Sequence, residues 1–553
     1  MRSGGAWGER NLMFIFGGSA RAIVLGLAGW LLAGCGDTMP PVIESIEVAN
    51  NPNDSAPLVA LFSLRASEPV RLRLLLEDGS EPWAARIDSS LARDHTGLLT
   101  RLRFDTRYDI TAIVTDTAGN ETRSDAQRLS IAPYPQDFPT LTLKTSDPAR
   151  MEPGLTLFNL IRWGANNVPD EDFGALLIVD SGGEVVWFYR AEHNVGDARQ
   201  LANGNILYGS GRSGVAHEID LRGDVVERWH AAGTTKDAPP DSIPVDTDTF
   251  HHEVAALGSG NLLTVGTEIR GYDGYPTSPA DITPRAEPAH LVGDLVVEFS
   301  RDGTIVREIK LLDVLDPYRI GSAASFSGAF WQPTYKDVFD GELLDWAHTN
   351  SVFYDAADDA FVLSARRQDA VVKVNASTGE LVWILGIHDR WNEPWSARLL
   401  SPVGALEWPN HQHAVKVTPQ RTYLMYDNGS NRENLAADAK PYSRAVEYAV
   451  DEEAMTVREV WSYGGRSGER FFSSFISDAD WLPHTGNVLI TDGGRIRDES
   501  GDDATEFEGH RWARLVEVTH AMPAEVVFEL IVDDETGRWH VYRADRINDL
   551  HVE

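Results

Sequence analysis

Histidines recur in this 553-residue sequence where apolar, strand-like segments begin. They open or precede the segments near 251–256, 348–354 and 411–417, and a fourth segment, 363–368, contains two adjacent arginines. Side chains alternate between the two faces of a strand, so we expect one member of each adjacent pair to face a shared axis if these strands lie together. The candidates are His251, His252, His348, His411, His413, Arg366 and Arg367.

Imidazole and guanidinium groups together narrow the chemistry of such a site. Neutral imidazole is the commonest nitrogen ligand of zinc and copper, so a metal site is one interpretation. Transfer of an anionic group is another, with one histidine as nucleophile or base and cations around the oxygens. Arginine repels a metal ion but grips two oxygens of a phosphate or sulfate. The arginines therefore favour an oxyanion, over both a metal and the simpler reading of polar side chains that line a water-filled channel.

A repeated pattern indicates the scaffold that would position these residues. Gly-centred turns followed by apolar residues and tryptophan occur at 181–187, 222–229 and 378–383. Asn-containing turns between apolar runs alternate with them, at 201–207, 257–263 and 482–489. Two hairpins per unit are typical of the four-stranded blade of a β-propeller. Complete pairs of hairpins fall at 198–229, 251–311, 348–386, 411–464 and 477–530, and strands at 155–163 and 176–189 supply most of a further pair. We therefore predict an all-β, six-bladed β-propeller over residues 140–545, with long insertions such as 312–345 around its central site.

The N-terminal part of the chain has a different organisation. Basic residues, a short apolar run at 22–33 and the box Leu32-Ala33-Gly34-Cys35 resemble a bacterial lipoprotein signal, too short to span a bilayer comfortably. We expect residues 1–35 to be this signal, with Cys35 lipidated and the protein held at the cell envelope, facing the periplasm or the surface. An uncleaved anchor is the alternative. Residues 40–135 alternate like short strands, and their Tyr and D-x-x-G-N turn predict a fibronectin III-like or immunoglobulin-like β-sandwich.

Composition excludes several function classes. The net charge is −35, which argues against sequence-independent binding to nucleic acid. Cys35 is the only cysteine, so the chain forms no intramolecular disulfide and no thiolate zinc site. Catalysis would depend on histidine, carboxylate, arginine or hydroxyl groups, or on a cofactor.

Several motifs in order carry a family resemblance. They are the segments 345–352, 363–374, 379–386, 410–414, 426–429 and 442–448. Over about 250–530 the chain closely resembles the bacterial arylsulfate sulfotransferases. The resemblance implies a periplasmic enzyme that moves a sulfuryl group from an aryl sulfate donor to a phenolic acceptor by a ping-pong mechanism, with no nucleotide, metal or other cofactor. Its membrane contact would be the lipid anchor alone, and a homodimer is left open.

The resemblance also implies roles for individual residues. His413 matches the nucleophile that becomes a sulfohistidine, and Arg366, rather than Arg367, matches the arginine. His348 and Asn350 match an H-x-N-S motif beside the sulfuryl oxygens. His252 matches a further histidine, with His251 as the fallback, and His411 is an additional substrate-binding candidate. This chain lacks the cysteine pair of better-known members, which leaves the acceptor open.

Two other functions stay open at this point. One is a non-catalytic envelope lipoprotein whose propeller binds ligands or partners. The other is a metal- or quinone-dependent oxidoreductase. Turnover of an aryl sulfate with added phenol would separate the enzyme from the binding protein.

Overall fold

The computed structural model describes residues 37–550 except 80–81, 211–212, 279–280, 282, 322–326, 431, 433–439, 466–468 and 505–506. The expected signal segment and Cys35 lie outside these residues. Over the described part, strands dominate, and the helical elements are all single turns: α1 (Leu311–Val314), α2 (Gln332–Tyr335), η1 (Arg366–Gln368) and η2 (Trp395–Arg398). Within that same part, no helix has the length and apolar character needed to cross a membrane.

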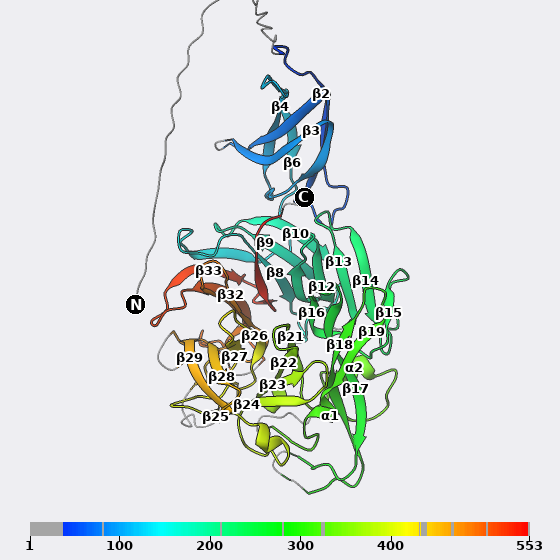
Figure 1. Cartoon of the computed structure of the whole chain (residues 1–553), viewed down its shortest axis with the longest axis vertical. Coiled ribbons are helices and arrows are strands. Elements are labelled where there is room, and N and C mark those ends of the chain that lie inside the picture. Colours follow the sequence, from blue (N-terminus) through cyan, green and yellow to red (C-terminus); the bar gives the residue numbers. More distant parts are fainter. Residues whose placement is uncertain are drawn as a thin grey trace, which may run out of the picture.

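The N-terminal unit is an antiparallel sheet (Figure 1). Its strands are β1 (Ile43–Asn50), β2 (Ala60–Glu77), β3 (Trp83–Leu99), β4 (Arg107–Thr115), β5 (Glu121–Arg123) and β6 (Gln127–Ser130). In β2, Val70, Leu72 and Leu74 are buried, whereas Arg71 and Arg73 between them are exposed, as the alternation predicts. The long strand β2 pairs with β1, β3 and β4, so all six strands belong to one hydrogen-bonded sheet. A sandwich of two separate sheets therefore remains a prediction.

Six further sheets follow. The first contains β8 (Leu155–Arg162), β9 (Gly174–Val179), β10 (Val185–Ala191), β34 (Trp539–His540) and β35 (Ala544–Ile547). The second contains β11 (Val195–Gln200), β12 (Ile206–Ser210), β13 (Val215–Ile219), β14 (Val225–Ala231) and β15 (Ile243–Val245). The third contains β16 (His251–Ala256), β17 (Leu262–Tyr272), β18 (Ala289–Phe299), β19 (Ile305–Lys310) and β20 (Leu343–Asp345).

The remaining sheets contain the other predicted hairpin pairs. The fourth contains β21 (Thr349–Asp355), β22 (Ala360–Ala365), β23 (Ala370–Asn375) and β24 (Leu381–Gly386). The fifth contains β25 (Ser401–Pro402), β26 (His413–Val417), β27 (Tyr423–Asp427), β28 (Arg444–Asp451) and β29 (Thr456–Gly464). The sixth contains β30 (Asp478–Trp481), β31 (Val488–Arg497), β32 (His510–Val518), β33 (Val526–Asp533) and β7 (Thr140–Ser146). The predicted grouping of hairpins thus matches the second to sixth sheets.

Inner strands of successive sheets contact one another. β35, β11, β16, β21, β26 and β30 touch in this order, and β31 of the last sheet touches β35 of the first. The strand that begins this part of the chain, β7, joins the last of the six sheets, and the strand that ends it, β35, joins the first. β7 pairs with β33, with Leu141 opposite Val532, and β35 pairs with β8, with Ala544 opposite Phe158. Side chains on the inner strands of several sheets are therefore brought to one region.

The tryptophans of the repeated motif link neighbouring sheets. Each is almost fully buried, and each donates its indole N–H to an acceptor in a turn of the next sheet, as a buried indole requires. The bonds run from Trp187 to Leu221 O (2.9 Å), from Trp229 to Arg301 O (2.8 Å), from Trp383 to Glu452 Oε1 (2.8 Å) and from Trp461 to Ala521 O (3.2 Å). The repeat seen in the sequence is therefore a repeat of contacts between sheets.

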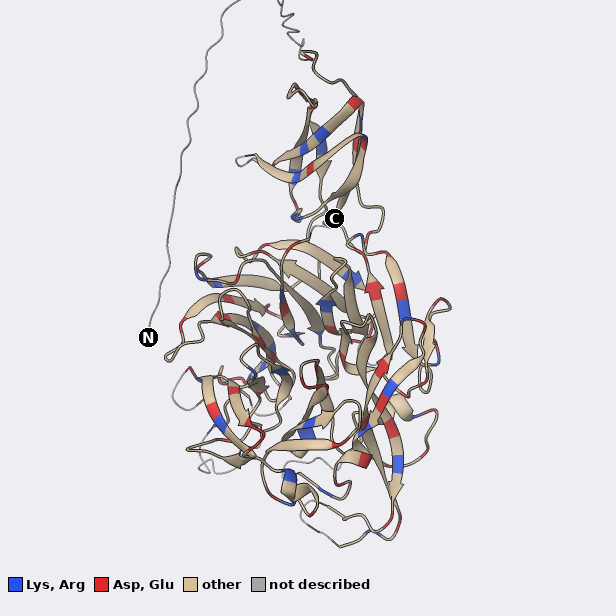
Figure 2. Ribbon diagram, in the orientation of Figure 1, with Lys and Arg blue, Asp and Glu red and all other residues tan. Residues whose placement is uncertain are grey.

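The N-terminal sheet adjoins the first two of the six sheets through the loop after β1. Asn51 donates its amide to Arg222 O at 2.8 Å, and Arg190 donates its backbone N–H to Ser55 O at 2.8 Å. Figure 2 shows that acidic and basic residues are interspersed along the strands of both parts.

Candidate active site

Most of the sequence-predicted residues line one cavity of about 320 Å³. One part of its wall is basic, another part is aromatic and aliphatic, and Glu171 and Asn194 also line it. The basic wall consists of His251, His252, His348, Arg366, Arg367 and His413. The apolar wall includes Ile161, Trp163, Phe330, Phe475, Ile476, Phe507 and Tyr542. This arrangement suits a ligand with an aromatic ring and an anionic group.

Irregularities in the strands bring the histidines to this cavity. The pairing register shifts between His251 and Val254 in β16 and between His413 and Lys416 in β26. His252 and His348 have φ values of +62° and +51°, a left-handed conformation that is costly outside glycine and is concentrated at functional sites. A bulge interrupts the two-residue alternation of a strand. This is why both His251 and His252 line the cavity, and the prediction that only one of them would face it was wrong.

The two arginines depart from alternation in a similar way. Arg366 and Arg367 belong to η1 rather than to a strand, and both line the cavity. The prediction that Arg367 turns away was therefore wrong. Their contacts differ, however: Arg367 donates its Nε–H to Asp345 Oδ2 at 2.6 Å, whereas Arg366 donates from Nη2 to Ser474 O at 3.0 Å. Burial and the neighbouring Arg367 lower the pKa of Arg366 to about 10, so it remains a cation at neutral pH.

His413 is held in one tautomer by its neighbour Asn428. The amide of Asn428 donates from Nδ2 to Ser473 O at 2.8 Å and to Ile476 O at 3.1 Å. Its Oδ1 is therefore the atom that lies 2.7 Å from His413 Nδ1, and a carbonyl oxygen accepts. His413 must carry its proton on Nδ1, which leaves the lone pair of Nε2 for the cavity. Burial and the charge of Arg366 lower the pKa of His413 well below its ordinary value, so the ring is neutral.

His348 is paired with a buried carboxylate. Its Nδ1 lies 2.7 Å from Oδ2 of Asp345, and the same oxygen accepts from Nε of Arg367. The other oxygen of this carboxylate, Oδ1, accepts from the indole N–H of Trp331 at 2.9 Å. Burial alone would raise the pKa of Asp345, but His348, Arg367 and Trp331 together hold it below its ordinary value. Burial lowers the pKa of His348, and the ionised Asp345 opposes that fall. His348 is thus the histidine of the cavity best able to become a cation next to a bound anion.

Asn350 and His411 are not among the described residues that line the cavity. Asn350 is fully buried, donates from Nδ2 to Gln412 O at 2.7 Å and accepts from the backbone N–H of Ala414 at 3.4 Å. It therefore braces the strand that carries His413. His411 is buried, and its backbone N–H donates to Asp369 Oδ1 at 2.9 Å. The placement of both residues fits a structural role better than the expected contact with substrate.

Several residues of the site escaped sequence reasoning. Asp345 and Asn428 lie inside the motifs that resemble the family, and the carboxylate three residues before His348 is a local signal for the first of them. Phe330 comes from the insertion 312–345, and Trp163, Phe475 and Tyr542 come from segments with no distinctive pattern. The cavity forms from many distant segments, so its apolar wall could not be read from local sequence.

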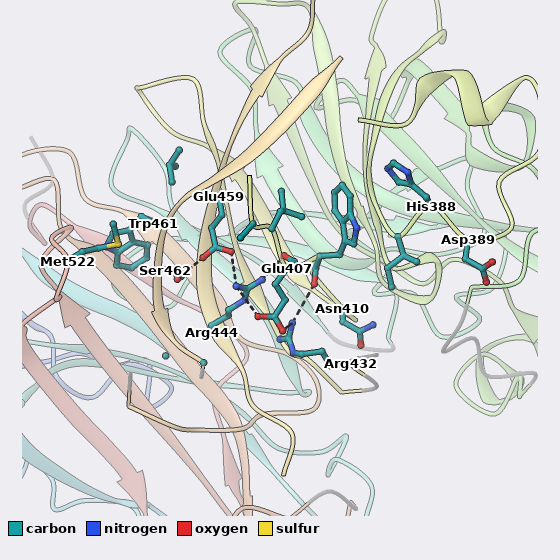
Figure 3. Close-up of a pocket in the computed structure, with 17 residues that line it drawn as sticks. His388, Asp389, Glu407, Asn410, Arg432, Arg444, Glu459, Trp461, Ser462 and Met522 are labelled. Atoms are coloured by element: carbon teal, nitrogen blue, oxygen red, sulfur yellow. Dashed lines mark hydrogen bonds and ion pairs between the residues drawn. The ribbon is translucent and has the colours of Figure 1, made fainter. Parts of the chain in front are cut away.

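A second cavity of about 820 Å³ is larger but contains none of the predicted residues (Figure 3). Its charged side chains neutralise one another. Glu407 lies 3.3 Å from Arg432 and 3.5 Å from Arg444, and Arg444 lies 2.9 Å from Glu459. Because these cations are already paired, this cavity is a poorer place for a small anion than the histidine-lined one.

The names of the relatives that this chain matches agree with the chemistry of the histidine-lined cavity. Two curated relatives are both named arylsulfate sulfotransferase AssT. That of Escherichia coli O6:H1 (strain CFT073) is 28% identical over 321 residues, 51% of this chain and 49% of the relative. That of Lelliottia amnigena is 29% identical over 268 residues, 42% of each chain. The chain thus spans about half the length, or less, of the curated relatives it matches.

Solved structures and family profiles complete the comparison. A protein of unknown function from Bacteroides caccae matches with a TM-score of 0.39 and 12% identity, covering 71% of this chain and 99% of that one. The sequence profile of the arylsulfotransferase (ASST) family matches residues 140–543, which is well over half of the chain. The chain therefore belongs to the arylsulfotransferase (ASST) family.

Proposed function

We propose that this protein is an arylsulfate sulfotransferase that transfers a sulfuryl group from an aryl sulfate to a phenol through a sulfohistidine on His413. One observation carries the proposal: a neutral histidine, with its Nε2 lone pair free, lies in the same cavity as Arg366, His348 and an aromatic wall. Membership of the family supports it. These residues supply a nucleophile, cations for the sulfuryl oxygens and a surface for an aryl ring.

The proposed donor step follows from these contacts. Nε2 of His413 attacks sulfur as the bond from sulfur to the phenolic oxygen breaks, and the electron pair leaves on that oxygen. Asn428 stabilises the ring because it accepts the Nδ1–H as positive charge develops on the imidazole. Arg366 and His348 hold the peripheral oxygens, where charge collects in a loose transition state. In the acceptor step a second phenolate attacks sulfur, and the electron pair of the S–N bond returns to His413.

We further propose the architecture and location that go with this reaction. The six sheets are the blades of a β-propeller over about 140–545, and the contacts among their inner strands support a ring. Residues 40–135 form a fibronectin III-like module, and 1–35 form a signal ending at Cys35 that anchors the protein to the bacterial envelope by lipid. Whether two copies associate is best settled by measuring the mass in solution.

A single-turnover experiment tests the function. Protein mixed with an aryl sulfate and no acceptor should release about one phenol per chain and then stop. Intact mass should show one added sulfuryl group on the peptide that contains His413, and an added phenol should discharge it. Exhaustive dialysis against a chelator should leave the burst unchanged, because the proposal needs neither a metal nor a nucleotide. Failure to form any adduct would favour a binding protein, and loss of the burst on chelation would favour a metal enzyme.

A further inference from the structure

We propose that His251 is a positioning residue that fixes the tautomer of His252, so that His252 presents a bare Nε2 to the cavity and exchanges the proton of the phenol. The sequence leaves the two histidines as alternatives for one role. Their contacts instead give each a role of its own. This inference rests on the proposed sulfotransferase function and adds the group that handles the phenolic proton.

The hydrogen bonds of His251 assign its proton. Its Nε2 lies 3.2 Å from Gly266 O and 3.5 Å from Asp294 Oδ1, and a carbonyl oxygen only accepts. The proton of neutral His251 is therefore on Nε2, and its Nδ1 is bare. Burial and the nearby His348 keep this ring neutral, since they lower the pKa of His251 to about 3.

The next bond then assigns the proton of His252. The two Nδ1 atoms of His251 and His252 lie 2.6 Å apart, so one of them must donate. Since His251 Nδ1 is bare, His252 donates, and a neutral His252 has no proton on Nε2. The ring of His252 packs against His348 at a centroid distance of 4.8 Å and against Tyr542 at 6.2 Å, both in the cavity wall.

The groups that meet the Nδ1 atoms of His252 and His348 give the two histidines different roles. Nδ1 of His348 meets the carboxylate of Asp345, which stabilises an imidazolium once a sulfuryl anion is bound, although burial holds the pKa of His348 below its ordinary value without that anion. Nδ1 of His252 meets only a neutral ring, and burial with the neighbouring His348 lowers its pKa well below the ordinary value. His252 therefore rests as a neutral acceptor.

His252 takes the proton of the acceptor phenol. The O–H bond of the acceptor phenol breaks, the proton bonds to His252 Nε2, and the phenolate oxygen attacks the sulfur on His413. His251 Nδ1 stabilises the resulting imidazolium because it still accepts the Nδ1–H of His252. The proton then passes to solvent or, in the donor step, to the oxygen of a basic phenolate that leaves.

Acceptors of different acidity test this role. General acid–base catalysis contributes about 10²–10⁴-fold, and it matters only when the phenol still holds its proton. His251→Phe should slow discharge of the sulfohistidine to a weakly acidic phenol about 10²-fold. With a phenol already ionised at the assay pH, the loss should be less than about 3-fold by the same reasoning. His251→Asn keeps an acceptor near the position of Nδ1 and should recover most of the loss.

Controls separate this inference from the proposed function. His217→Phe removes another buried imidazole, one stacked on Tyr208 at 4.6 Å and absent from the described cavity wall, and it should not distinguish the two phenols. In His251→Phe, the burst from an aryl sulfate with a weakly basic leaving phenolate should fall much less than discharge to the weakly acidic phenol does, because that step needs no proton. If the wild-type protein showed no burst, the proposed sulfotransferase function would be refuted instead. Equal losses with both phenols, or no recovery in His251→Asn, would overturn the role of His251.

A spectroscopic measurement on the wild type covers the case in which His251→Phe fails to fold. Nitrogen NMR of protein labelled at histidine distinguishes the two neutral tautomers. We expect His252 to be protonated on Nδ1 and His251 on Nε2. The opposite assignment for His252 would overturn the proposal without any variant at His251.

Discussion

Arg366→Lys probes the electrostatics of the cavity most directly. The guanidinium of Arg366 uses one N–H on Ser474 O, which leaves the rest of its planar fork for sulfuryl oxygens. A lysine keeps the charge but offers it from a single point. Removing one preorganised donor of this kind costs about 2.7–4 kcal/mol of barrier, so we expect the burst rate at neutral pH to fall about 10²–10³-fold.

The same substitution should create a new pH dependence. Burial and Arg367 lower the pKa of Arg366 from its ordinary value to about 10. An ordinary lysine ammonium has a pKa of about 10.4, already below that of a guanidinium, so the same burial and the same neighbour would bring the pKa of a lysine at this position closer to neutral. The variant should then lose further activity as the pH rises through that value, because the cation becomes neutral, whereas the wild type keeps its charge.

Stopped-flow bursts between about pH 6 and 9 with one aryl sulfate would measure both effects. Arg367→Lys is the matched control: its contact with Asp345 runs through Nε alone, so a lysine can replace it with a smaller loss and no alkaline decline. An Arg366→Lys rate within a few-fold of wild type would refute the reasoning. So would a larger loss in Arg367→Lys.

Three other predictions follow from the contacts described. His413→Ala should abolish both the adduct and transfer while circular dichroism stays unchanged. His411→Ala should be milder because His411 is not among the described residues that line the cavity, and equal losses in the two variants would point to the wrong residue of the pair. Burial and Arg366 lower the pKa of His413 well below its ordinary value, so the neutral, nucleophilic imidazole is present at every pH above that lowered pKa. The burst rate should therefore be flat from about pH 5.5 to 8. A midpoint at about pH 6.5 in the wild-type burst would contradict this. Trp383→Phe deletes the bond to Glu452 and should reduce the free energy of unfolding in urea by about 1–3 kcal/mol, whereas no change in the midpoint would show that the link between sheets is weak.

The sequence was most informative where the pattern is local. The tryptophan turns and the Asn turns are short-range signals, and they predicted which strands share a sheet because antiparallel hairpins pair neighbours in the chain. The histidines were recognisable for the same reason, since each opens a strand at a comparable point. Alternation failed at His251 and Arg367, because bulges and a 3₁₀ turn depend on how neighbouring sheets pack and not on the residues themselves.

Roles that depend on distant partners were out of reach. The orientation of Asn428 is set by the carbonyls of Ser473 and Ile476, more than forty residues further along the chain. The division of work between His251 and His252 depends likewise on Gly266 and Asp294. No spacing rule connects such residues, so a sequence-based reading could name the histidines but not the tautomers that make them chemically different.

The pairing of β35 with β8 has a consequence for biosynthesis. Residues 544–547 complete a sheet whose other main strands lie between 155 and 191, and the neighbouring Tyr542 forms part of the cavity wall. A chain that emerges from the N-terminus onward therefore leaves one edge of β8 without its partner until residues 544–547 have been delivered, and exposed edges invite pairing with other chains. The histidine-lined cavity is completed at the same moment, because Tyr542 belongs to its wall. A chain that stopped before residue 542 would lack both the closing strand and part of the cavity wall, so it would be prone to aggregate and its cavity would be incomplete.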